Sequence, residues 1–218
     1  MREEIEDERI DPERFWEERY QAASSGSSGK PGSVLRRFTE ALAPGRALEL
    51  GCAKGDDAVW LARLGWRVVA VDISSAALGY AADNAERHGV ADRVTFEKHD
   101  LSRSFPGGLF DLVVASFLQS PFDWPRSAVL ARAAEAVAPG GHLLIVDHGS
   151  RAPWSWSPPD TPFPTVGETL TGLALRERDW AQIHVDAIER RGKGPDGQTA
   201  MVLDNVIFLR RLSTLEAE

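Results

Sequence analysis

Acidic side chains recur at three places where a short apolar run of the sequence ends. Glu49 lies in ALELGCAKGDD, Asp72 ends RVVAVD, and Asp100 follows VTFEKH. A carboxylate in the first place suits an ammonium group better than a pyrophosphate, which it would repel. Asp72, 23 residues after Glu49, can accept hydrogen bonds from both hydroxyls of a ribose. Asp100 could meet an adenine amino group, with Leu101 against the ring.

A glycine-rich turn follows the first of these acids. Gly51 and Gly55 flank it, and their missing side chains let the backbone approach a ligand and leave amide groups of a helix N-terminus free. Many strand-to-helix turns hold glycine for steric reasons alone. The turn indicates a ligand site only together with the acids at the ends of successive strands. Cys52, inside the turn, is interpreted as a small residue in a tight place rather than as a reactive thiol.

The histidines predict no metal site, because they show no metal-ligand spacing and lie on separate elements, at positions 88, 99, 142, 148 and 184. His148 follows the apolar run HLLIVD and is therefore a candidate general base, the alternative being a hydrogen-bonded loop histidine. Further along, Trp154, Trp156 and Phe163 are candidates for an apolar substrate wall, or for ordinary packing over the sheet edge.

The elements that must position these residues alternate between β-branched runs and amphipathic segments. Strands are predicted at 46–50, 67–71, 92–100, 111–116 and 142–147, and helices at 33–43, 56–65, 74–89 and 125–141. This alternation implies right-handed crossovers and a mostly parallel, doubly wound α/β sheet. Ligands of such sheets bind beyond the carboxyl ends of the strands, where the acids lie.

The two ends of the sequence depart from this alternation. Near the start, Asp11 and Pro12 begin a predicted helix over 12–23, and SSGSSGKPG at 24–32 reads as a flexible linker. Near the end, a helix at 165–175 precedes strands at 180–191 and 200–211, joined by the hairpin sequence GKGPDGQ. We therefore expect one domain over residues 1–218, with helix and linker in 1–32 and a core in 33–218. Its sheet is expected to be seven-stranded and Rossmann-like, with a C-terminal antiparallel hairpin.

Composition narrows the set of partners. Lys and Arg number 25 against 33 Asp and Glu, a formal charge of −8, which argues against a large nucleic-acid or anionic-membrane surface. Cys52 is the only cysteine, so no intrachain disulfide is expected. The acidic first ten residues do not resemble a secretory signal, and no apolar run approaches the length of a membrane span. We expect a soluble, cytoplasmic protein with no nucleic-acid or membrane partner, and the sequence leaves its oligomeric state open.

Taken together, several segments resemble the successive motifs of class I S-adenosylmethionine-dependent methyltransferases. They are ALELGCAKGDDAVWLARLGWRVVAVDIS, DRVTFEKHDL, FDLVVASFLQSP and AVAPGGHLLIVDHG. Within that superfamily the chain is most similar to small bacterial proteins grouped with the tellurite-resistance and thiopurine methyltransferases. The resemblance covers roughly residues 12 to 212, including the early FWEERY and the terminal hairpin.

This resemblance implies S-adenosyl-L-methionine as the cofactor and assigns its contacts. It implies contacts to the methionine part from Glu49, Gly51, Cys52 and Gly55; to the ribose from Asp72; to the adenine from Ile73, Asp100 and Leu101; and near the sulfonium from Ser116 and Phe117. The middle glycine of the usual turn is Ala53 here. A methyl group is tolerated there if φ is negative, so this departure concerns the loop geometry more than the identity of the cofactor.

The expected activity is methyl transfer to a small-molecule acceptor by in-line displacement, which needs alignment and exclusion of water more than a catalytic side chain. SFLQSP replaces the Asn/Asp-Pro-Pro-Tyr run of base-amino methyltransferases, which favours a small acceptor. One alternative is a nicotinamide-dependent oxidoreductase, but its fingerprint needs glycine where Ala53 and Asp56 stand, and the Asp56 carboxylate would face the pyrophosphate. The other alternative is a non-catalytic S-adenosylmethionine-binding protein.

Overall fold

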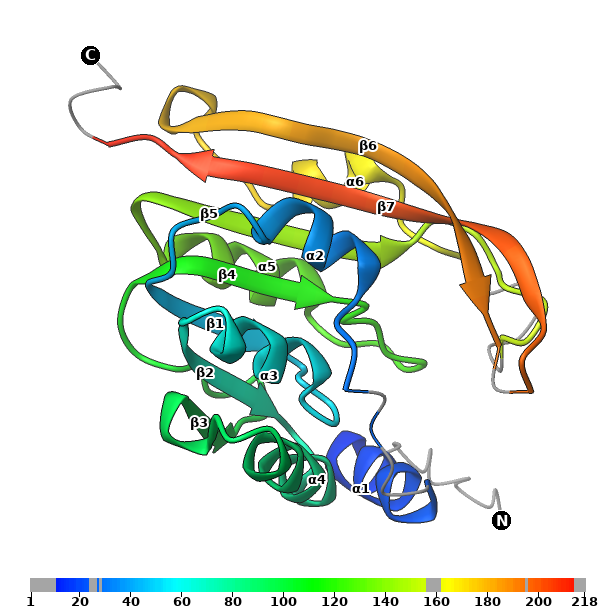
Figure 1. Ribbon diagram of the computed structural model, residues 1–218. Helices are drawn as coiled ribbons and strands as arrows, with labels where there is room; N and C mark the ends of the chain where they lie inside the picture. Colours follow the sequence, from blue (N-terminus) through cyan, green and yellow to red (C-terminus); the bar gives the residue numbers. More distant parts are fainter. Residues whose placement is uncertain (1–10, 24–26, 28, 156–161, 195, 214–218) are drawn as a thin grey trace, which may run out of the picture.

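A seven-stranded sheet forms the centre of the computed structural model, which describes residues 11–23, 27, 29–155, 162–194 and 196–213. The strand order is β3-β2-β1-β4-β5-β7-β6 (Figure 1). The strands are β1 Arg46–Leu50, β2 Arg67–Asp72, β3 Val94–Lys98, β4 Phe110–Ser116, β5 Val137–His148, β6 Trp180–Lys193 and β7 Thr199–Arg211. β1 to β5 pair in parallel, and β7 pairs antiparallel with both β5 and β6. The predicted fold class is confirmed.

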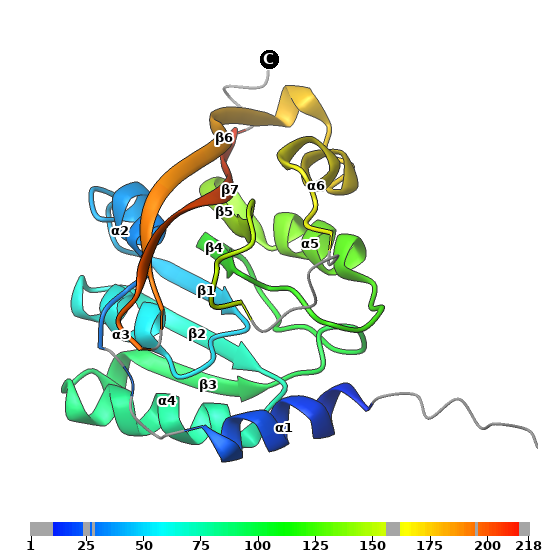
Figure 2. The same ribbon diagram turned by 90° about the vertical axis from the view of Figure 1, so that its right-hand side faces the viewer.

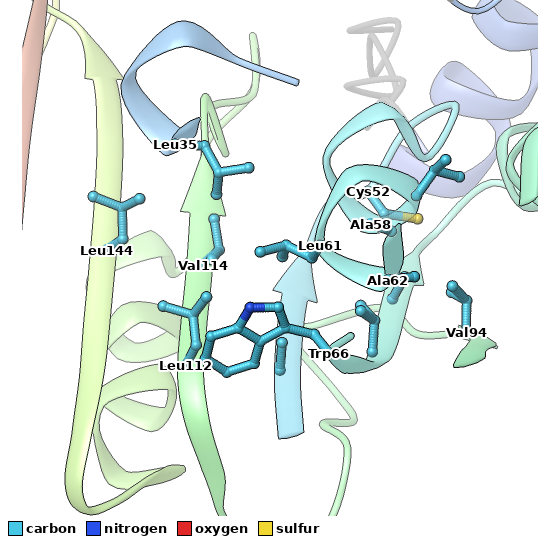
Figure 3. Close-up of a cluster of buried hydrophobic side chains, with 14 of the residues drawn as sticks. Leu35, Cys52, Ala58, Leu61, Ala62, Trp66, Val94, Leu112, Val114 and Leu144 are labelled. Atoms are coloured by element: carbon cyan, nitrogen blue, oxygen red, sulfur yellow. The ribbon is translucent and has the colours of Figure 1, made fainter. Parts of the chain in front are cut away.

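Helices cover both faces of this sheet. α2 Ser33–Thr39, α3 Asp56–Arg63 and α4 Ser75–Arg87 lie on one face, and α5 Arg126–Glu135 and α6 Val166–Gly172 lie on the other (Figures 1 and 2). Two apolar clusters fill the layers between sheet and helices. In the first, Figure 3 shows the indole of Trp66 beside Leu61 and Leu112. No helix in the described part of the chain is long and apolar enough to cross a bilayer.

The helix expected over 33–43 ends at Thr39, and the largest difference from a predicted boundary is at the end of α5. The helix expected over 125–141 ends at Glu135, and β5 already begins at Val137, which pairs with Phe110. Pro139 cannot continue the helical hydrogen bonds, and Gly140 has a φ of +82°. A Cβ at Gly141 would lie 3.0 Å from three backbone oxygens. The strand therefore takes over the segment that the amphipathic pattern had assigned to the helix.

Two further features stand at the carboxyl edge of the parallel strands. α1, Pro12–Ala22, lies beside α4 at this edge (Figures 1 and 2). Its start is as predicted, because the Asp11 side chain accepts a 3.0 Å hydrogen bond from the amide of Glu13. The hairpin of β6 and β7 projects past the end of β5, since β7 pairs with β6 alone beyond the His148 and Asp204 pair. Both features are placed to frame a ligand.

The predicted linker after α1 is only partly described, since 24–26 and 28 lie outside the described residues. Its other residues are tied to the start of α3. The Gly29 amide donates to Asp56 at 2.7 Å, and the Gly32 amide donates to Asp57 at 2.6 Å. Ser27 also donates its hydroxyl to Asp56. Asp56 is thus an acceptor for the segment that leads away from α1.

Candidate functional site

A cavity opens at the carboxyl ends of the parallel strands, where the acids were expected to meet. Six of the predicted cofactor residues line it: Gly51, Asp72, Ile73, Asp100, Leu101 and Phe117. α1 supplies Pro12, Trp16 and Tyr20 to the same lining. Glu49, Cys52, Gly55 and Ser116 lie in or beside the turn without lining the cavity. The site therefore has a floor of strand ends and a cover made by the first helix.

The glycine-rich turn needs its glycines for both conformation and space. Gly51 and Gly55 have φ of +71° and +74°, a region that favours glycine. A Cβ at Gly51 would lie 2.7 Å from Leu118, and one at Gly55 would lie 2.8 Å from Ala81. Ala53 has a φ of +50°, so the negative φ at which a methyl group would be tolerated is not adopted at this position. The turn holds an alanine in a left-handed conformation that glycine adopts at lower cost.

Asp72 ties this turn to the end of β2. Its carboxylate accepts hydrogen bonds from the amide of Ala53 at 2.9 Å and from the amide of Ser74 at 3.0 Å. Burial raises the pKa of Asp72, and these bonds act in the opposite direction. Asp72 therefore shapes the loop as well as lining the cavity.

Glu49 is buried below the turn, with 4% of its surface exposed. Its Oε2 atom has no hydrogen-bond partner among the described residues. Burial and the nearby Asp57 and Asp72 raise the pKa of Glu49 well above its usual value. A buried acceptor that lacks a donor is costly, and a cationic ligand group would relieve that cost. The residues present thus fit the ammonium end of an amino-acid-bearing cofactor.

The remaining residues of the predicted set have local partners. Cys52 is buried, and burial raises the pKa of its thiol, as suits a structural residue. The Ser116 hydroxyl donates to Asp57, which links β4 to α3. Asp100 accepts from the amide and hydroxyl of Ser102 at 3.0 and 2.6 Å, so part of its hydrogen-bonding capacity stabilises its own turn.

The docking of α1 depends on a residue that the sequence analysis missed. Glu17 accepts from the Ser74 hydroxyl and the Ala76 amide at the N-terminus of α4. These bonds lower the pKa of Glu17. Burial, and to a lesser extent the nearby carboxylate of Asp72, raises the pKa of the phenol of Tyr20 on the same helix. A glutamate inside a polar helix gives no sequence signal for such a role.

His148 stands beside the cavity rather than in its lining. Its ring stacks on Phe117 with 4.4 Å between centroids and meets the Phe163 ring at 5.8 Å. Phe117 has a φ of +53°, which is strained for a bulky residue. His148 is exposed at the end of β5, but partial burial of its ring lowers the pKa of the imidazole. The ring is therefore neutral at pH 7 and able to accept a proton.

Comparison with known proteins agrees with this geometry. Residues 47–141 match the family model described as a methyltransferase domain. The ribosomal protein L11 methyltransferase of Pelotomaculum thermopropionicum is 39% identical over 125 residues, which is 56% of this chain and 39% of that protein. The 27-O-demethylrifamycin SV methyltransferase of Amycolatopsis mediterranei is 35% identical over 105 residues, which is 47% of this chain and 38% of that protein. The chain thus spans about two fifths of the length of these relatives.

Solved structures share the fold over more of the chain. A protein from work on the conversion of a disulfide bond into a thioacetal group during echinomycin biosynthesis has a TM-score of 0.72 at 24% identity, covering 92% of both chains. The N-methyltransferase NodS of Bradyrhizobium japonicum WM9, in complex with S-adenosyl-L-homocysteine, has a TM-score of 0.64 at 20% identity, covering 92% of this chain and 99% of that one. These likenesses show a shared α/β Rossmann-like fold. The matched family model and the neighbour that holds S-adenosyl-L-homocysteine support S-adenosylmethionine as the cofactor.

Proposed function

We propose that this protein transfers a methyl group from S-adenosylmethionine to a small-molecule acceptor. The observation that carries the proposal is the meeting of Gly51, Asp72 and Asp100 in one cavity next to the buried Glu49, whose Oε2 atom has no partner among the described residues. A ribose, an adenine and an ammonium group carry donors that these carboxylates can accept. The nicotinamide alternative is disfavoured because Glu49 would repel a pyrophosphate and Asp56 already accepts from Gly29.

In this assignment each side chain binds or orients, and none needs to react. Glu49 and the turn hold the methionine end, Asp72 holds the ribose, and Asp100, Ile73 and Leu101 hold the adenine. The bound cofactor supplies an electrophilic methyl group. Phe117 and Leu118 border the cavity, while Trp16 and Tyr20 cover it and exclude water. Alignment and exclusion of water are the main requirements of such a displacement.

The proposed acceptor lies on the side of His148. Phe117, His148 and Phe163 form an aromatic cluster there, and Trp154 packs beside Gly192 and Gly194 of the hairpin. Stacked rings favour a compact organic molecule over a charged polymer. The net charge of −8 and the sequence SFLQSP also disfavour a nucleic acid. The resemblance of FWEERY and the terminal hairpin to the tellurite-resistance and thiopurine group supports a small acceptor as well.

Two measurements test the proposal. Calorimetry should show binding of S-adenosylmethionine and its demethylated product, but no binding of nicotinamide dinucleotides. Product masses should then be measured with a panel of thiols, phenols, amines and tellurite, and in parallel with ribosomal protein and ribosomal RNA. A gain of one CH₂ on a small molecule supports the proposal. Transfer to ribosomal protein or RNA alone would refute the small acceptor, and tight dinucleotide binding without cofactor binding would refute the methyltransferase.

A further inference from the structure

Arg126 occupies an unusual place for a cation. It is the first residue of α5, where the helix dipole disfavours positive charge, and only 16% of its side chain is exposed. Burying a guanidinium at a helix N-terminus is costly unless specific partners compensate for it. The partners of Arg126 should therefore show what the arrangement achieves.

Those partners join the loop after β4 to the end of β5. The Arg126 Nε donates to the carbonyl of Leu118 at 2.9 Å, while its Nη2 pairs with the Asp147 carboxylate. The Asp147 side chain is 2% exposed and also accepts from the Thr169 hydroxyl of α6. One planar fork thus holds a backbone carbonyl and a buried carboxylate together, a geometry that lysine cannot reproduce.

The loop held in this way forms one border of the proposed cofactor site. It begins at Phe117, whose φ of +53° must be maintained by surrounding contacts. Leu118 presses against Gly51 so closely that a Cβ at Gly51 would lie 2.7 Å from it. The Gln119 amide closes the turn by donating to the Phe117 carbonyl at 2.8 Å. A shift of Leu118 would therefore move both the strained Phe117 and the wall beside the glycine-rich turn.

We propose that Arg126 is a positioning residue that acts through Leu118 to hold the loop of residues 117–120 against the cofactor site. This inference rests on the proposed function for its kinetic consequence, but not for its structural one. Removing Arg126 should loosen the loop in the free protein. It should then weaken cofactor binding and lower turnover.

The test compares Arg126→Met with the double variant Arg126→Met/Asp147→Leu. The single variant leaves Asp147 buried without its partner and should be strongly destabilised, whereas an apolar pair should recover much of the stability. Both variants should show faster hydrogen exchange at residues 117–120, and at least about tenfold weaker binding of S-adenosylhomocysteine. Arg93→Met is the matched control. Arg93 also donates to a backbone carbonyl, that of Ala62 at 3.2 Å, but it precedes β3 and lies at the edge of the sheet opposite to the cavity.

The outcomes separate this inference from the proposed function. Failure of the wild-type protein to bind S-adenosylhomocysteine would refute the proposed function. Hydrogen exchange at residues 117–120 would then still test whether Arg126 positions the loop. A stable double variant with wild-type exchange and affinity would overturn the positioning role. If both methionine variants unfold, Arg126→Lys decides, since it keeps the charge beside Asp147 but cannot hold Leu118 at the same time. A folded lysine variant with wild-type exchange and affinity would also overturn the role.

Discussion

The Glu17 carboxylate accepts hydrogen bonds from the Ser74 hydroxyl at 2.8 Å and the Ala76 amide at 3.1 Å, which makes a residue of α1 a cap for α4. A second polar tether from α1 to the sheet edge is the exposed pair of Glu13 with Lys98. None of the α1 residues is fully buried. The hydrogen bonds of Glu17 are thus among the contacts that hold the cover over the cofactor site.

Glu17→Ala should therefore loosen the cover. We expect about fivefold weaker binding of S-adenosylhomocysteine, from the loss of roughly 1 kcal/mol of hydrogen bonding, and faster hydrogen exchange in α1. Because the folded-state pKa of Glu17 is lowered, its contact persists at neutral pH and is lost only as the pH falls below 4.5. Glu18→Ala is the control, since Glu18 pairs with Arg14 on the exposed side. Equal effects of the two variants would contradict the capping role.

Asp72 offers a test of the ribose assignment. Asp72→Asn keeps one acceptor for the amides of Ala53 and Ser74 but loses the charge. It should weaken cofactor binding by about 1.5 to 3 kcal/mol, the scale of hydrogen bonds to a charged group. Asp72→Ala should lose stability as well, because both amides are left without an acceptor. Calorimetry and urea unfolding measure the two effects. A folded Asp72→Ala variant with wild-type affinity would remove Asp72 from the ribose site.

Ala53 should be better replaced by glycine. At a φ of +50° an alanine is strained, and relief of that strain should exceed the entropy that glycine adds to the unfolded chain. We expect Ala53→Gly to raise the free energy of unfolding by about 0.5 to 1 kcal/mol. Ala174→Gly is a matched control, because Ala174 also has a φ of +50° but follows α6, outside the cavity lining. Stability lost in Ala53→Gly would show that the turn is unstrained.

Much of the fold follows from the sequence because its signals are local. The short run RALEL predicted β1 and the valine-rich run RVVAV predicted β2 within a residue, and Asp11 with Pro12 predicted the start of α1. The end of α5 was missed because amphipathic spacing continues past Glu135, while strand pairing with Phe110 decides the conformation of Val137.

The residues of the site also differ in whether a local sequence signal marks them. Asp72 and Asp100 could be predicted as site residues because they follow predicted strands, and both line the cavity. Glu17 and Arg126 do not, since their roles depend on contacts 57 residues away at Ser74 and 21 residues away at Asp147. A sequence gives no measure of such pairings. The conformation of Ala53 was likewise hidden, because the backbone of a turn is set by the elements on both sides of it.

Glu49 makes the stability of the cofactor-free protein depend on pH. Its folded-state pKa lies well above the ordinary 4.5, so the folded state holds more protons than the unfolded state above that pH. Stability should therefore fall as the pH rises from about 4.5 through the folded-state pKa of Glu49. Bound S-adenosylmethionine should reduce this fall, because its ammonium group compensates the carboxylate. Tm measured against pH, with and without cofactor, checks the effect.

Glu49→Gln is the matched variant for that measurement. It should flatten part of the pH dependence of the free protein, the rest arising from Asp57 and Asp72, whose pKa values are also raised by burial. It should also weaken the stabilisation by cofactor. A variant with the wild-type slope would show that Glu49 does not titrate in the folded protein over this range.

His148 connects the geometry to the chemistry of the acceptor. Its imidazole lies against Phe117, at the border of the cavity, and its lowered pKa leaves it neutral and able to accept a proton at pH 7. If the acceptor is a hydroxyl or an amine, His148→Ala should lower turnover by about two to four orders of magnitude with little change in cofactor affinity. The wild-type rate should rise with pH through the lowered pKa of His148, and this rise should be absent in the variant.

If the acceptor is a thiol or a tellurium or selenium oxyanion, the nucleophile already carries charge or a readily lost proton, and the variant should lose little turnover. Turnover with one confirmed acceptor at several pH values separates the two cases, and His148→Phe, which keeps an aromatic ring but not the base, shows whether stacking on Phe117 alone suffices. A hydroxyl acceptor methylated by His148→Ala at the wild-type rate would leave alignment in the pocket as the sole source of catalysis.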